Sequence, residues 1–251
     1  MSKRFKGKLC VYCGQRSSTR TGDHVFAREF FTNDKRDNLP KVPACEHCNN
    51  EKSRLEHYLT AVLPFGGVHE DASAALTGMV PSRLAKNERL HREIAEGSEQ
   101  LLAEEMAGQP LPTLTVPLDG TALERLFEFV VRGLVFYHWG TLLDDQHGVR
   151  LVTLTKVGEE AFSHFLNMNA HEHVSINLGG GTFRYEGKQG DHPELTVWRF
   201  QIYGGLTMAG DPDAPGETAR GIGAITATRE FLERKAIVDV LGEAPGIVKK
   251  E

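Results

Sequence analysis

The sequence predicts an α+β protein in three consecutive parts: a small N-terminal module, a helical segment and an antiparallel β-meander. Three observations predict this arrangement. Two Cys-x-x-Cys pairs lie in the first fifth of the chain, at Cys10/Cys13 and Cys45/Cys48. Thr121–Trp139 carries apolar residues at helical spacing, and the C-terminal third alternates like strands between glycine-rich turns.

The first part is expected to span residues 1–63 and to end at the turn-forming run from Pro64 to Gly67. Within it, Lys8–Tyr12 and Thr21–Val25 are predicted as short strands and Asn50–Val62 as a helix. Residues 69–251 would then form a body of unassigned function. We expect it to be helical over 69–168 and mostly β over 170–230.

Two helices are predicted in the body before its strands begin. Ser82–Glu96 has a charged, amphipathic pattern, with Pro81 suited to a first helical turn. Thr121–Trp139 is strongly apolar but interrupted by charges, which makes it a buried core helix. The remaining expected elements are a strand at Val149–Thr155, a helix at Gly158–Met168, and strands at His173–Leu178, Thr182–Glu186, Leu195–Gly204 and Thr218–Thr228.

Charge is divided unevenly along the 251 residues, whose formal net charge is −5. Residues 1–56 hold 12 Lys+Arg and 7 Asp+Glu, a balance of +5, which leaves 17 and 27, or −10, for the rest. Any contact with a polyanion is therefore expected through the N-terminal part. A basic start without an apolar signal core, and the lack of a long apolar stretch, predict a soluble cytoplasmic protein.

The four cysteines predict a structural zinc site. Each Cys-x-x-Cys pair lets two thiolates from one tight turn reach the same ion, and two such turns complete a closed tetrahedral cage. So few cysteines in so tight an arrangement favour metal ligation over a disulfide framework. A closed cage offers no position for water, so the expected role of this zinc is to fold the module.

The residues between and after the two cysteine pairs resemble the HNH endonuclease family. Asp23-His24 follows the first pair, Asn38-Leu39 precedes the second, and Asn49 comes directly after the last cysteine. The resemblance covers about residues 8–57 and implies a ββα-metal nuclease module of the variant that ends in asparagine.

This resemblance implies a role for each matching residue. Asp23 and Asn49 would hold a catalytic Mg²⁺ or Mn²⁺, since carboxylate and amide oxygens suit a hard ion. His24 would be the general base that takes a proton from the attacking water. Asn38 would orient that base and tie the loop together, while Arg28 and Lys52 are candidate phosphate contacts.

The expected function is therefore metal-dependent hydrolysis of phosphodiester bonds, in DNA more readily than in RNA. One alternative is a catalytically inactive zinc-knuckle protein that only binds nucleic acid. Another is a nuclease effector of bacterial defence, restrained by a protein partner through the body. Each residue also has a plainer interpretation: Asp23 as a turn residue, His24 as a buried strand histidine, and Asn49 as a helix cap.

Overall fold

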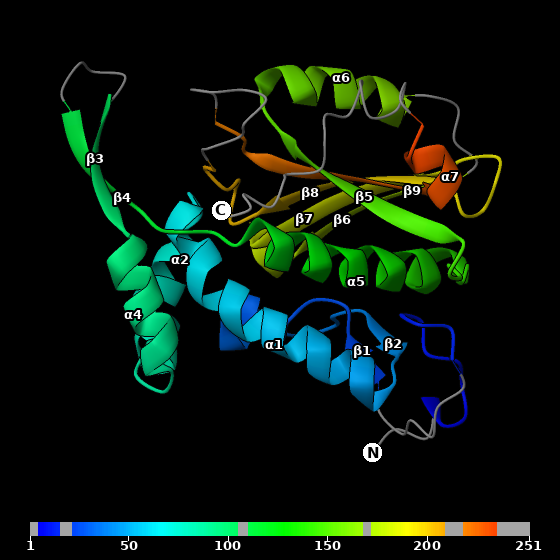
Figure 1. Ribbon diagram of the computed structural model, residues 1–251, viewed down its shortest axis with the longest axis horizontal. Helices are drawn as coiled ribbons and strands as arrows, with labels where there is room; N and C mark the ends of the chain where they lie inside the picture. The colour runs from blue at the N-terminus through cyan, green and yellow to red at the C-terminus, as the bar shows by residue number, and fades with distance from the viewer. Residues whose placement is uncertain (1–4, 16–21, 105–109, 168–171, 209–217, 235–251) are drawn as a thin grey trace, which may run out of the picture.

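The computed structural model describes residues 5–15, 22–104, 110–167, 172–208 and 218–234. Its elements stack in layers (Figure 1). A five-stranded antiparallel sheet lies between α6 (Lys156–Asn167) on one face and α5 (Gly120–Trp139) on the other. α1 (Glu46–Val62) and a two-stranded hairpin lie beyond α5, so α5 is the central layer between the hairpin and the sheet.

The five-stranded sheet has the order β5-β9-β8-β7-β6, and its last four strands form the predicted antiparallel meander. Alternate side chains point to its inner face, as the period of two requires, and the large aromatic ones among them are buried. The strands are β5 (His147–Leu154), β6 (Glu172–Leu178), β7 (Phe183–Gln189), β8 (Thr196–Ile202) and β9 (Gly221–Thr228).

Helix α5 confirms the predicted core helix almost to the residue. Asp119 caps its start, since its side chain accepts a hydrogen bond from the Ala122 N–H at 3.1 Å. Gly140 ends it in the left-handed conformation, with φ of 70°. Apolar residues on both faces are buried because α5 packs against the sheet on one side and against α1 and β2 on the other.

The N-terminal part contains the second predicted strand and the predicted helix, but the partner of that strand is a segment in which no strand was predicted. β1 (Gly22–His24) pairs antiparallel with β2 (Lys41–Pro43), and α1 follows directly, four residues earlier than predicted. The strand predicted at Lys8–Tyr12 is wrong. That segment bends into a turn, because the chain between Cys10 and Cys13 must bring both thiols to one point.

The segment predicted to be helical over 69–168 is more broken than expected, and the assignment is corrected in two places. Asn87 caps a new helix in the middle of the predicted Ser82–Glu96 helix, dividing it in two. A hairpin of two strands follows, where Pro110 and Pro112 exclude a helix. The elements are α2 (Glu70–Ala74), a π-helical turn η5 (Ala75–Met79), α3 (Val80–Leu84), α4 (Glu88–Gly97), β3 (Glu99–Glu104) and β4 (Pro110–Thr115).

Short turns complete the chain: the 3-10 turns η2 (Arg28–Phe30), η3 (Asn33–Lys35), η4 (Leu63–Gly66) and η6 (Gly179–Gly181), and the helix α7 (Arg229–Leu232). None of the helices in the described ranges has the length and apolar character that crossing a bilayer requires.

The hydrophobic core is continuous across the predicted boundary after residue 63. The ring of Phe26, from the N-terminal part, lies 4.4 Å from the ring of Phe183 in β7. The Tyr203 hydroxyl donates a hydrogen bond to the Phe30 carbonyl at 2.9 Å, and both groups are buried. The N-terminal part therefore packs as one layer of a shared core.

Candidate functional site

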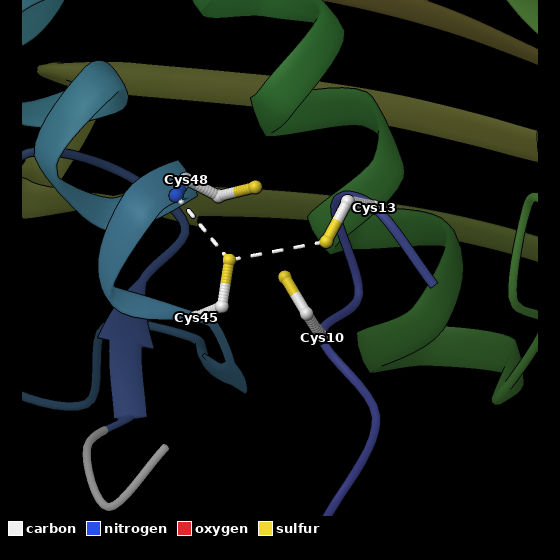
Figure 2. Close-up of side chains that lie close together, drawn as sticks. All are labelled: Cys10, Cys13, Cys45 and Cys48. Carbon is white, nitrogen blue, oxygen red and sulfur yellow. Dashed lines mark hydrogen bonds between the residues drawn. The ribbon is translucent and has the colours of Figure 1, made fainter. Parts of the chain in front are cut away.

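The four cysteine sulfurs converge at one point between the turn at Cys10–Cys13 and the start of α1 (Figure 2). All four Sγ atoms lie within 4.8 Å of one another. Tetrahedral zinc at about 2.3 Å from each sulfur would separate the sulfurs by about 3.8 Å. The Sγ atoms of Cys13 and Cys45 are 3.8 Å apart, which is the spacing that two sulfurs on one zinc ion would have.

The thiols of this cage are free and mostly buried, so any thiolate among them needs a cation close by. Burial raises the pKa of Cys10 and Cys48. Burial opposes ionisation of Cys45 too, but hydrogen bonds from the Cys48 backbone and side chain outweigh it and lower the Cys45 pKa. Four clustered sulfurs with this chemistry fit a structural zinc ion. Among the described residues, no other set of three or more His, Cys, Asp or Glu side chains brings its ligand atoms together.

The cysteine cage links the hairpin to the helix. Cys45 is the N-cap of α1, and its sulfur accepts the Cys48 N–H at 3.3 Å. The Val11 N–H, in the first turn, donates to the Pro43 carbonyl of β2 at 3.0 Å. Because Cys48 precedes Asn49, any ion in the cage also fixes the position of Asn49 relative to β1.

Asp23 lies in β1 on the face that points toward α1, and one of its oxygens is already occupied. The Tyr12 hydroxyl donates to Asp23 Oδ2 at 2.6 Å. The Lys52 ammonium lies 3.1 Å from the same oxygen. Burial, followed by the Asp23 charge, raises the pKa of Tyr12 well above its usual value, so the phenol stays protonated and donates.

Lys52 does not occupy the position expected of a phosphate contact. Its side chain is only 1% exposed, and its ammonium donates to the His24 carbonyl oxygen at 2.6 Å. It also forms an ion pair with Glu56, one helical turn further along α1. The predicted phosphate contact is therefore corrected: Lys52 connects β1 to α1 from inside the protein.

Glu56 and Tyr12 belong to this cluster but were missed at the level of sequence. Burial raises the pKa of Glu56 to about 7, although the Lys52 charge opposes the shift. The i, i+4 spacing of Lys52 and Glu56 was a usable signal for their pairing. Nothing in the sequence around Tyr12 indicated that its hydroxyl would reach Asp23.

His24 lies next to Asp23 in β1. Its partner across the strands is the exposed Lys41, whereas Asp23 is paired with the buried Val42. His24 is half-buried and is not part of the hydrophobic core. Burial, then the charges of Lys41 and Arg28, lower the pKa of His24, and the Asp23 carboxylate only partly offsets this.

The two predicted asparagines lie in different elements, Asn49 in α1 and Asn38 in the loop before β2. Asn49 is half-buried and lies three residues before Lys52 on α1, so it shares the helix face that carries Lys52 and Glu56. Asn38 is exposed and has a φ of 57°, a left-handed conformation that asparagine tolerates better than most residues. Asn38 therefore shapes the loop that leads into β2.

The predicted ligands of the catalytic ion are of the kind that a hard cation prefers, but the Lys52 ammonium competes with the cation for Asp23. One carboxylate and one amide offer oxygen atoms of the kind that Mg²⁺ or Mn²⁺ prefers. The Lys52 ammonium already neutralises part of the Asp23 charge. Arg28, the remaining predicted phosphate contact, is exposed at the start of η2, where a phosphate could reach it.

Comparisons with protein-family models, curated proteins and solved structures give no match for this chain.

Proposed function

We propose that this protein is a metal-dependent endonuclease that hydrolyses phosphodiester bonds in DNA, with His24 as the general base. The observation that carries the proposal is the setting of His24. Its imidazole is half-buried on a strand that the cysteine cage and Lys52 fix in place, with the cations Lys41 and Arg28 close enough to lower its pKa.

The lowered pKa suits the proton transfer that this reaction needs. Water attacks phosphorus, a P–O bond forms, and the proton of the water passes to the imidazole nitrogen as the leaving oxygen departs. A base must be unprotonated before the step, and burial together with Lys41 and Arg28 favours the neutral ring. Those same two cations would attract the phosphate backbone toward His24.

Asp23 and Asn49 are the residues that would hold the divalent ion. Such an ion would supply positive charge to the developing phosphorane and to the leaving oxygen. The protein contributes a rigid frame for these ligands, because the cysteine cage fixes the start of α1 and Tyr12 orients Asp23.

The test is a cleavage assay with the zinc-loaded full chain on supercoiled plasmid, linear duplex, single-stranded DNA and RNA. We expect cleavage of DNA that requires added Mg²⁺ or Mn²⁺ and leaves 3′-hydroxyl ends, the outcome that the HNH resemblance implies. Absence of cleavage on all four substrates with either ion would contradict the proposal.

One observation favours the second candidate, a zinc-knuckle protein that binds nucleic acid without cutting it. The ammonium of Lys52, 3.1 Å from Asp23, competes with any cation for that carboxylate. A pure binder would retard labelled DNA in a gel-shift assay without needing divalent ions. It would leave the DNA intact when Mg²⁺ or Mn²⁺ is added, which separates it from the nuclease.

A further inference from the structure

Two carboxylates share one buried ammonium beside the proposed catalytic strand. Lys52 is 1% exposed, and its ammonium contacts Asp23 of β1, Glu56 of α1 and the backbone carbonyl of His24. A lysine ammonium has three donors, so these three contacts match its full hydrogen-bonding capacity. The Tyr12 hydroxyl adds a second donor to the same Asp23 oxygen.

We propose that Lys52 and Tyr12 are positioning residues that hold Asp23 through Oδ2 and His24 through its carbonyl, leaving Oδ1 of Asp23 for the divalent cation. Glu56 also pairs with Lys52, and its negative charge weakens the effect of the ammonium charge on Asp23. This inference rests on the proposed function, since it assigns a task to residues around the proposed ligand and base.

The geometry gives Lys52 two opposing effects. Its charge lies 3.1 Å from Asp23 Oδ2, so it repels any second cation that approaches the same carboxylate. Its bond of 2.6 Å to the His24 carbonyl fixes the backbone that carries the base. Removing the ammonium should therefore strengthen cation binding and weaken catalysis at the same time. A residue that served only to stabilise the fold would weaken both.

Glu56 should have the opposite effect on cation binding. Glu56→Gln keeps the shape of the side chain and an oxygen acceptor but removes the negative charge that partly neutralises the Lys52 ammonium. More of the ammonium charge then falls on Asp23, and the cation is held less tightly. Tyr12→Phe removes only the hydroxyl that donates to Asp23 Oδ2, which leaves more negative charge on the carboxylate for a cation at Oδ1. It should therefore strengthen cation binding while keeping the aromatic packing against Phe129.

The experiment measures Mn²⁺ binding to the zinc-loaded full chain without DNA. Electron paramagnetic resonance at mildly alkaline pH monitors the free Mn²⁺. We expect the Mn²⁺ dissociation constant to fall about tenfold in Lys52→Met and about threefold in Tyr12→Phe, and to rise about threefold in Glu56→Gln. Arg54→Met and Glu46→Gln are matched controls, because both change the charge of exposed α1 residues and should leave binding unchanged.

Cleavage by the same variants supplies the second readout. Lys52→Met should lose at least tenfold in kcat while binding Mn²⁺ more tightly. If Lys52→Met does not fold, the opposite shifts of Tyr12→Phe and Glu56→Gln decide. Equal Mn²⁺ affinity in Tyr12→Phe, Glu56→Gln and wild type would overturn this inference even if wild type cleaves DNA. The predicted shifts without any cleavage would overturn the nuclease and leave the positioning role in place.

Discussion

Lys41 lies directly across the hairpin from His24 and is exposed, which makes it the best-placed cation for a substrate phosphate. Lys41→Ala should weaken DNA binding several-fold and lower the slope of affinity against salt concentration by about one. Fluorescence anisotropy with labelled duplex across a salt series measures both. Arg54→Ala is the control on the same module, and an equal loss in both variants would show a general charge effect.

The pH dependence of cleavage should report His24. Its pKa is lowered from 6.5 by burial and by Lys41 and Arg28, and the base acts only when unprotonated. The rate should therefore fall as pH drops through a midpoint below 6.5. Lys41→Ala removes one of the lowering charges, so it should move this midpoint upward. A midpoint that stays fixed in Lys41→Ala would show that another group controls the acid limb of kcat/KM.

At the scale of elements, the cysteine cage couples the turn at Cys10–Cys13 to the first turn of α1. Cys45 caps the helix and Cys48 lies in its first turn, so loss of the ion should fray the residues that lead to Asn49. Chelation, or Cys48→Ser, should speed amide hydrogen exchange over residues 41–56 and abolish cleavage. Cobalt substitution should give intense thiolate charge-transfer bands. Unchanged exchange after metal removal would contradict a structural role for the cage.

The predictability of the elements followed the strength of their local pattern. α5 and the meander were predicted well, because their apolar period is long or repeated and the apolar positions are the ones buried in the core. The hairpin of β3 and β4 was missed, since the two prolines of β4 hide the alternation that marks a strand. Lys8–Tyr12 failed for a different reason. The convergence of four cysteines, which is a tertiary constraint, overrides its strand preference.

At the scale of the whole molecule, the shared core links the first 63 residues to the rest. Val25, Phe26, Phe30 and Phe31 are at most 2% exposed, and Phe26 and Phe30 pack on β7 and Tyr203. The full chain should unfold in one cooperative transition by calorimetry. Residues 1–66 alone should aggregate or bind a hydrophobic dye, even with zinc. A soluble, well-dispersed fragment that cleaves DNA would instead support a nuclease released from its body.

Sequence reasoning reached the cage and the residues of the proposed site, but not how they are held. The cage could be predicted from the cysteine spacing, because each short Cys-x-x-Cys turn by itself brings two sulfurs together. The structure places all four sulfurs together. The contacts of Asp23 with Tyr12 and Lys52 cross 11 and 29 positions, and they depend on how the first turn and α1 pack against β1. No spacing rule predicts such a cluster, and for that reason Lys52 was predicted to contact phosphate.

The central claim, that His24 acts as a general base in DNA hydrolysis, is tested most directly by single-turnover cleavage with His24→Ala. Zinc content and duplex affinity should match wild type, because the imidazole is not part of the cage or the core. The account predicts a rate at least about a hundredfold lower than wild type with Mg²⁺ or Mn²⁺. Equal rates for the two proteins would contradict it.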